Sequence, residues 1–538
     1  MWPGGMMKLT RRQFVGTSAT FAASFALPLN ARAQDTQTLR LGMGAAQVGT
    51  IDPIKLTQGV DNWALNHVFD QLVRPPAGLG TAAPEAYVPE IAETWEMSKD
   101  AKTWTFHLRK GVQFHKGYGE LTSEDVKFSF DRAANPKAGS VNSISWQNVQ
   151  SVEAPDSYTV VLKLAGPDPL LLTSVVHGTN AAIVSKKAVE EKGDRFAMDP
   201  IGSGPYQLDS VQSDLVRLVA NTDYWGEKAK IPNMEISYIV DTSARTFAIL
   251  GGTVDMILAP AGPGAINSIM QQNPNLKMDI SLPGNNCSLH FNMGREPFGD
   301  ERVRKAFAYA IDKQAISNSL TPVTPRTFGL NPPANPGALT EKNTPAELRY
   351  DHNPEKAKAL LAEAGFAKGL SFSAFCSQRD DYASLMLIIQ EQLRQVGVNM
   401  DLKFMDHTSY HAEKNKDLNT LILRLGGYPQ VPTRVIQNEA ISAAEVKKDG
   451  SGGDNFSHYG VIIPGIDDLY NKATNEPDLN RRLELVTEME RKILTDMPVM
   501  SLCSTAYVVI RNPNMTLPFT VSTVAGGTWR LTGAEKLA

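Results

Sequence analysis

Two histidines are the first candidates for chemistry in this chain, because His407 and His411 stand four residues apart. On a helix, that spacing places both imidazoles on one face, where they can ligate a single metal ion. The spacing fixes no third ligand, since Glu413 would point to a different face of the same helix. A solvated helix surface is the other interpretation. The pair therefore keeps one alternative function open, that of an exported metal-binding or hydrolytic protein.

The motifs of well-known enzyme classes are missing from the sequence. Ser203 lies in the segment 202–205 (GSGP), which lacks the G-x-S-x-G spacing of a nucleophilic serine. There is neither a G-x-x-x-x-G-K-[ST] phosphate loop nor an H-E-x-x-H zinc helix. The three cysteines, Cys287, Cys376 and Cys503, have no metal-ligand spacing and are too few for a disulfide scaffold. We therefore expect no catalytic activity, no bound metal and no cofactor.

Composition narrows the class of protein further. The 538 residues carry 53 basic and 57 acidic side chains, a net charge of −4, so no positive excess exists to bind nucleic-acid phosphates. Hydrophobic residues make up 42% of the chain, which is enough for packed cores. At roughly 150 residues per domain, the length predicts about three domains. No apolar run reaches the roughly 18 residues of a transmembrane helix, which excludes a polytopic membrane protein.

The first 33 residues have the parts of an export signal in the expected order. A basic start at 8–12 is followed by a mildly apolar stretch at 14–29 and by a small-x-small cleavage pattern that ends at Ala33. The pair Arg11 and Arg12 makes the signal similar to a twin-arginine signal. We expect cleavage near Ala33 and a periplasmic location. The signal would remove four basic residues and no acidic ones, so acidic residues outnumber basic ones by eight in the mature chain.

Hydrophobic periodicity predicts a chain of mixed α and β structure. Alternation of apolar and polar side chains predicts strands at 104–109, 158–163 and 287–292. Helical spacing and capping residues predict helices at about 301–317, 354–364, 381–396 and 478–494. The alternation of strands and helices in the second half indicates an α/β lobe.

Short motifs along the chain occur in the order of one protein family. They stand at 91–95 (IAETW), 104–115 (WTFHLRKGVQFH), 202–206 (GSGPY), 221–226 (NTDYWG), 297–313 and 354–365. In this order they resemble the extracytoplasmic solute-binding proteins of ABC importers of the peptide/nickel type, which include oligopeptide- and dipeptide-binding proteins. The motifs span most of the chain after the signal. Most of these residues are typical of strand edges, turns and helix caps, so they indicate the fold and not the ligand contacts.

The resemblance implies an α/β, two-lobed periplasmic binding protein of the Venus-flytrap type, with an extra subdomain in the first lobe. By similarity, the parts are lobe I at 36–284 with the subdomain at about 66–200, lobe II at 285–504, and a return to lobe I at 505–538. Crossing segments near 284–292 and 501–508 would join the lobes. They carry Cys287 and Cys503, for which a disulfide and two free thiols are both open.

The resemblance also implies a mechanism. A peptide-sized solute that contacts both lobes favours the closed state, and only that difference in affinity can drive closure. The closed monomer would deliver the solute to the permease subunits of an ABC importer, and it would do no chemistry itself.

The segment at 424–430 of lobe II bears on the identity of the solute. Peptide-binding relatives read R-x-G-W-x-x-D there, and the Asp holds the amino terminus of the peptide. In this chain Arg424 and Gly426 match, but Gly427 takes the Trp position and the Asp position falls near Gln430. A neutral amide cannot form the charge-assisted hydrogen bond that an α-ammonium requires. Arg424 could instead hold a carboxylate, sulfonate or phosphate, or it could form an ion pair inside its lobe. The departure from the pattern keeps an oligosaccharide or an opine-like conjugate open as the solute.

Other candidate solute contacts lie at the ends of strands or on the crossing segments, where each could equally belong to the core or the surface. Tyr428, Tyr507 and Trp529 could form a stacking wall for a sugar or an aromatic group. The remaining candidates are Met43 and Gln47 after the first strand, and Arg379 and Tyr382 between a strand and a helix.

Overall fold

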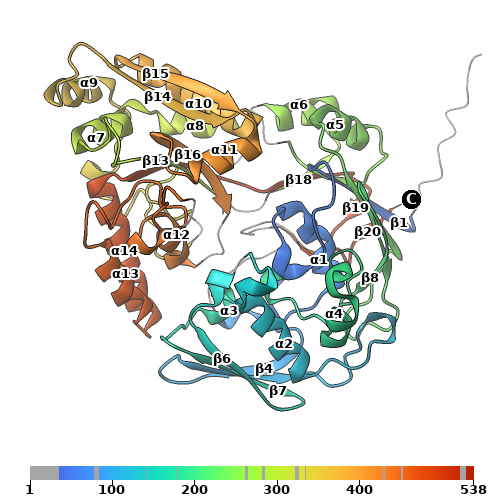
Figure 1. The fold of residues 1–538 in the computed structure, drawn as a ribbon. Coiled ribbons are helices and arrows are strands. Elements are labelled where there is room, and N and C mark those ends of the chain that lie inside the picture. Colours follow the sequence, from blue (N-terminus) through green and yellow to red (C-terminus); the bar gives the residue numbers. More distant parts are fainter. Residues whose placement is uncertain are drawn as a thin grey trace, which may run out of the picture.

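The computed structural model shows two α/β lobes joined by extended segments of the chain (Figure 1). It describes residues 36–77, 84–141, 143–176, 178–260, 264–280, 285–320, 326–333, 335–427, 431–449, 452–521 and 529–537. The predicted export signal lies outside these residues.

Lobe I is built on a seven-stranded sheet. In spatial order its strands are β12 (Lys277–Ile280), β18 (Val508–Arg511), β11 (Met256–Leu258), β1 (Thr38–Met43), β10 (Asn233–Tyr238), β9 (Leu215–Ala220) and β8 (Tyr206–Gln212). β1 is parallel to β10 and β11, so the carboxyl ends of these three strands lie at one edge of the sheet. β18 comes from the end of the chain and pairs with β11 and β12. Helices α5 (Thr242–Leu250) and α6 (Ala265–Gln272) cover one face of this sheet through apolar side chains.

A second sheet of four antiparallel strands lies at the far end of lobe I (Figure 1). In spatial order its strands are β4 (Ala92–Met97), β5 (Thr103–Leu108), β7 (Thr159–Leu164) and β6 (Val149–Asp156). The helices of this region are α1 (Asn62–Val68), α2 (Ser123–Ala134), α3 (Leu171–Ser174) and α4 (Lys186–Lys192). Two short strand pairs complete the lobe: β2 (Val73–Arg74) with β3 (Val88–Pro89), and β19 (Met515–Thr516) with β20 (Glu535–Lys536).

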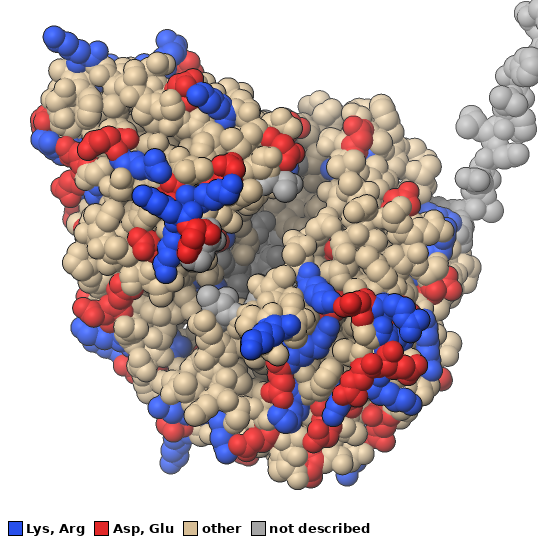
Figure 2. All heavy atoms as spheres, viewed as in Figure 1, with Lys and Arg blue, Asp and Glu red and all other residues tan. Residues whose placement is uncertain are grey.

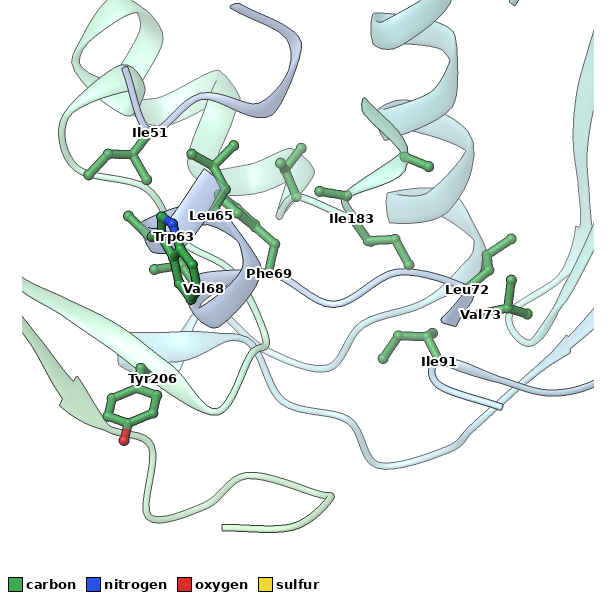
Figure 3. Packing of buried hydrophobic residues seen from close by; sticks show 14 of the residues in the cluster. Ile51, Trp63, Leu65, Val68, Phe69, Leu72, Val73, Ile91, Ile183 and Tyr206 are labelled. Atoms are coloured by element: carbon green, nitrogen blue, oxygen red, sulfur yellow. The ribbon is translucent and has the colours of Figure 1, made fainter. Parts of the chain in front are cut away.

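One continuous hydrophobic core joins the two sheets of lobe I. It contains Leu39 and Leu41 of the large sheet together with Phe106 of the small one, all fully buried. Figure 3 shows the middle of this core, where Trp63 and Phe69 from α1 and its following residue pack between segments of both parts. The small sheet is therefore fixed to the large one and moves with it.

The GSGPY motif is explained by a close approach of two backbones. The Gly204 amide donates to the Val68 carbonyl at the end of α1, at 2.9 Å. A side chain at Gly202 would bring its Cβ within 2.0 Å of that carbonyl oxygen, so only glycine fits there. Ser203 is fully buried and donates from Oγ to an Asp70 carboxylate oxygen at 2.9 Å. The motif serves chain packing.

Lobe II contains a three-stranded antiparallel sheet and a parallel pair of strands. The sheet runs β16 (Leu421–Gly427), β13 (Asn285–Phe291), β17 (Val499–Thr505), and the pair is β14 (Leu370–Ser377) with β15 (Val398–Met405). The helices are α7 (Glu301–Ala310), α8 (Lys313–Leu320), α9 (Pro354–Glu363), α10 (Asp380–Arg394), α11 (His407–Lys414), α12 (Pro432–Glu439), α13 (Ile466–Thr474) and α14 (Leu479–Asp496). Two separate hydrophobic clusters lie on either side of the three-stranded sheet.

Most of the predicted elements agree with these bounds to within a few residues, and one does not. The single helix predicted at 301–317 is wrong, because α7 ends at Ala310 and α8 begins at Lys313. Between them, Ile311 is extended and the Asp312 carboxylate accepts from the Ala315 amide at 2.9 Å, as a helix-capping residue does. The apolar spacing continues across this break because both helices bury side chains in one core.

Candidate functional site

The surface is hollowed between the two lobes (Figure 2). In Figure 1, α1 of lobe I and α12 of lobe II lie at this hollow, and β13, β17 and β18 belong to the segments that connect the lobes. The hollow is therefore bordered by both lobes and by the segments that connect them, so a hinge motion of the lobes would change its width.

The sheet of lobe II carries buried polar side chains on the face opposite its main core. Ser288, His290 and Arg424 point away from the main core because side chains alternate along β13 and β16. Glu439, fully buried at the end of α12, accepts from the Ser288 hydroxyl at 2.9 Å and from Arg424 Nη1 at 2.8 Å. Its Oε2 also lies 3.1 Å from His290 Nε2.

Arg424 is paired inside its own lobe. Besides Glu439, its Nη2 donates to an Asp454 carboxylate oxygen at 2.8 Å, and Lys414 Nζ lies 3.8 Å from the other oxygen of Asp454. Burial works against ionisation of Asp454, but the charges of Arg424 and Lys414 outweigh it and lower the pKa of Asp454. Burial lowers the pKa of Lys414 to about 8. Of the two roles that the sequence left open for Arg424, the structure contains the ion pair, and a solute contact stays a prediction.

Gly426 makes room for the Arg424 guanidinium. A Cβ at Gly426 would lie 2.3 Å from Arg424 Nη1, because the two residues are two apart on the same face of β16. Gly427 is the last residue of β16 and pairs with Asn285 of β13. Tyr428 and Gln430 lie outside the described residues.

Arg379 and Tyr382 lie together at the start of α10. The Arg379 guanidinium, which is half exposed, donates from Nε and Nη2 to the two Asp381 carboxylate oxygens at 2.7 Å each. Its Nη1 lies 3.0 Å from His407 Nε2. Tyr382 is buried beside this pair, and its hydroxyl is hydrogen-bonded to the backbone of Leu425 in β16. Tyr382 thus contacts the same strand that carries Arg424.

His407 and His411 pack as an aromatic pair, with ring centroids 4.5 Å apart and nearly perpendicular planes. A guanidinium can only donate, so His407 Nε2 is the acceptor from Arg379, and Nδ1 carries the proton toward Ser377 Oγ at 2.9 Å. Both ring nitrogens of His407 are therefore engaged in hydrogen bonds. Burial lowers the pKa of His411 to about 4. In the described part of the chain, no three His, Cys, Asp or Glu side chains are grouped so that they could hold a metal ion.

The aromatic candidates of lobe I also come together. Tyr507 accepts a hydrogen bond from Trp63 Nε1 at 2.9 Å, and Trp63 makes an edge-to-face contact with Trp529 at 5.3 Å. Trp529 is 5% exposed, and its indole N–H has no hydrogen-bond partner among the described residues. The sequence analysis did not select Trp63, since one tryptophan on a short amphipathic helix carries no signal that distinguishes a site from a core.

The remaining candidates, Met43 and Gln47, differ in their exposure to solvent. Met43 is fully buried in the core of lobe I, whereas Gln47 is exposed on the loop after β1. Gln47 therefore has a side chain that a solute can reach.

Cys287 and Cys503 lie directly opposite each other on β13 and β17. Both are fully buried and both are free thiols. Contact with the Cys503 thiol, together with burial, raises the pKa of Cys287 well above its usual value. The crossing strands thus bring Cys287 and Cys503 together as two free thiols, one of the two alternatives that the sequence left open.

Comparison with known proteins decides the family. The model of the bacterial extracellular solute-binding proteins, family 5, matches residues 86–439. This chain belongs to that family. The dipeptide-binding protein of Escherichia coli is 30% identical over 455 residues, which cover 79% of this chain and 82% of the relative. The family and fold predicted from the sequence are confirmed.

Solved structures agree with this assignment. The binding protein MoaA from A. tumefacien R10, in complex with mannopinic acid, has a TM-score of 0.81 and 28% identity and covers 93% of this chain and 99% of its own. The periplasmic protein DppA from Helicobacter pylori, in complex with the peptide STSA, shares the fold with a TM-score of 0.77 at 23% identity and covers 93% and 98% of the two chains.

The family assignment confirms the predicted function at the level of its class. The protein is a solute-binding component of an ABC import system, and its relatives are transport proteins. Among the described residues, no helix has the length and apolar character needed to cross a membrane.

Proposed function

We propose that this protein is a monomeric periplasmic receptor that captures a small carboxylate-bearing conjugate of the opine type in the hollow between its lobes. It is exported by the twin-arginine-like signal at 1–33 and delivers the solute to the permease subunits of its importer without chemistry of its own. Free peptides and neutral oligosaccharides are the competing solutes.

The observation that carries this proposal is the lack of an available acidic side chain where peptide-binding relatives hold the peptide ammonium. The segment 421–438 contains no Asp or Glu. The next residue, Glu439, is fully buried and already accepts from Ser288 and Arg424. An α-ammonium placed against this segment would therefore lose its water without gaining a charged partner from residues 421–439, which is costly.

Positively charged groups are available for a carboxylate instead. Arg379 is half exposed, and its Nη1 is bound to His407, a neutral acceptor whose pKa is lowered by burial and by the Arg379 charge. Replacing this neutral acceptor by a solute carboxylate strengthens the hydrogen bond, because a charged acceptor binds a guanidinium more tightly. Arg424 on β16 adds a second guanidinium, which in this structure is paired with Glu439 and Asp454.

The aromatic group of lobe I supports a solute with hydroxyl groups. Tyr507 is partly buried and provides a ring that suits the apolar side of a sugar-derived chain, whereas Trp63 and Trp529 are buried and support it. The Trp529 N–H, which has no partner among the described residues, is a donor for which a solute oxygen is the natural acceptor. The similarity to a protein solved with mannopinic acid is consistent with this chemistry.

Calorimetric titration of the mature chain with mannopinic acid, the dipeptide Met-Leu and maltose tests the proposal. We expect mannopinic acid to bind at least tenfold more tightly than Met-Leu, and maltose to give no heat. Tighter binding of Met-Leu, or binding of maltose alone, would contradict it.

A gain-of-function variant sharpens the test. Gln430→Asp supplies the missing carboxylate and is expected to raise affinity for Met-Leu about tenfold, the value of one charge-assisted bond. N-acetyl-Met-Leu lacks the ammonium and is the matched control, for which we expect no gain.

A further inference from the structure

The two lobes also touch each other away from the hollow, through polar groups. Arg482 of α14 in lobe II donates from Nη2 to the Pro167 carbonyl of lobe I at 2.9 Å, and its Nη1 lies 3.6 Å from an Asp168 carboxylate oxygen. Arg434 of α12 donates to the Ser174 carbonyl of α3 at 3.4 Å. In Figure 1, the lower ends of α13 and α14 approach α3 and the small sheet.

This contact joins two cores that do not merge. Leu171 and Leu172 belong to the core of lobe I, whereas Val435 and Val486 belong to a separate cluster of lobe II. No apolar cluster of the described residues spans the two sides. Separating the lobes here would expose polar groups that water can satisfy and would break no hydrophobic core, so the contact can open and close at small cost.

Both sides of the contact are held in place within their own lobes. The Asp168 carboxylate accepts from the Leu170 amide at 2.9 Å and from the Ser174 hydroxyl at 2.6 Å. Arg482 donates to the carbonyls of Thr474 and Glu476 at 2.9 and 3.0 Å, and only 4% of its side chain is exposed. Because neither side chain has to be ordered when the lobes meet, little conformational entropy is lost on contact.

We propose that Asp168, Arg434 and Arg482 form a closure latch that stabilises the closed arrangement of the lobes without touching the solute. Such a latch supplies part of the free energy of closure from the protein itself, so the affinity for a solute rises with the fraction of closed protein. It acts equally on every solute that needs closure. A residue that contacts the solute instead changes the affinities of different solutes by different factors.

The variant Asp168→Asn tests the latch while it keeps the size and the Oδ1 acceptor of the side chain. We expect a loss of affinity of about three- to tenfold for each solute that the wild-type chain binds, as is typical for a partly buried ion pair. Mannopinic acid and Met-Leu are the probes, and the ratio of their affinities should stay within about twofold. Arg482→Gln should give the same uniform loss.

Arg481→Gln is the matched control, because Arg481 precedes Arg482 on α14 but its ion pair, within the part of the chain that the structure describes, is with Glu484 of the same helix. It should leave affinity unchanged. Thermal unfolding of each variant separates weaker closure from a failure to fold.

Small-angle X-ray scattering of the solute-free protein provides a readout that needs no solute, and it stays informative if the proposed solute class is wrong. We expect a larger radius of gyration for Asp168→Asn and Arg482→Gln than for the wild type and for Arg481→Gln. Equal radii together with unchanged affinities would overturn the latch. A loss of affinity for one probe only would also overturn it, because it would place Asp168 in the solute site.

Discussion

Each lobe contains a buried cluster of arginine and carboxylates, and the two clusters differ in completeness. In lobe I, Arg530 pairs with Asp70 at 2.8 Å and with Glu90 at 2.6 Å. Its remaining donors reach the carbonyls of Asn66 and Phe69 at 2.8 and 2.7 Å. The cluster ties the last segment of the chain to α1 and to the start of the small sheet.

The cluster of lobe II surrounds Arg424 in the middle of β16. Asp454, one of its two carboxylates, keeps 34% of its side chain exposed, whereas Asp70 and Glu90 keep almost none. A cluster whose charged groups are all buried and paired stabilises the fold. A cluster with a partly exposed carboxylate can exchange one of its ion pairs for a contact with a solute. The comparison therefore predicts that the lobe I cluster governs stability and the lobe II cluster governs binding.

The largest expected effect follows from removing Arg530. Arg530→Met leaves two buried carboxylates without their cation and should lower the free energy of unfolding by about 3–5 kcal/mol. Urea denaturation followed by circular dichroism measures it. A loss below 1 kcal/mol would show that the lobe I cluster is not structural.

The same cluster predicts a pH dependence of stability. Burial raises the pKa of Glu90 to about 7, because it outweighs the charge of Arg530 and because Asp70 lies beside it. Between pH 4.5 and 7 the unfolded chain loses this proton while the folded chain keeps it, so the free energy of unfolding should fall as pH rises, by about 1–3 kcal/mol from this group. Glu90→Gln mimics the protonated form and should remove that part of the fall in denaturation curves at pH 5 and pH 8. An unchanged difference between the two pH values would contradict the assignment.

In lobe II, removal of the central arginine is expected to reduce solute affinity more than the free energy of unfolding. Arg424→Met should weaken the binding of mannopinic acid at least tenfold, because a guanidinium that holds a carboxylate contributes about 1.5–3 kcal/mol. Calorimetric titration measures the affinity, and thermal unfolding reports whether the fold is intact. Full affinity in a folded variant would restrict Arg424 to its ion pairs.

The smallest expected effect comes from Gly426→Ala. The added methyl group displaces the Arg424 guanidinium, whose Nη1 lies 2.3 Å from the new Cβ position, but keeps its charge. We expect a three- to fivefold loss of affinity, smaller than that of Arg424→Met because the guanidinium can move aside. The same titration tests it, and a loss equal to that of Arg424→Met would mean that position matters as much as charge.

The sequence was sufficient for the family and for most elements, because these depend on local patterns. Alternation marked β5 and β7, and Asn353 before Pro354 marked the start of α9, where the Asn353 side chain accepts from the Lys356 amide. It failed at Ile311, where one apolar stripe serves two helices. Periodicity reports which side faces a core and does not report a change in helix direction.

The candidate site was predictable only in part. Arg379 and Arg424 both lie close enough to Tyr382 to affect the pKa of its hydroxyl, so these three candidates of lobe II do gather. Met43 lies in the core instead of at the surface, and Trp63 was not selected at all. The position of a residue in the sequence shows which strand it lies near. The alternation of side chains along that strand, together with the packing of neighbouring elements, decides whether its side chain points into the core.

By itself the sequence determined that this chain is a two-lobed solute-binding protein and that segment 421–438 offers no acidic partner to a peptide ammonium. Only the tertiary structure decided that Glu439 is buried under Arg424 and that Asp168 meets Arg482 across the lobes. The reason is physical: residue types and spacing fix local conformation and available charge. The partner of a charge 15 or 314 positions away is set by how the elements pack, and packing is a property of the whole chain.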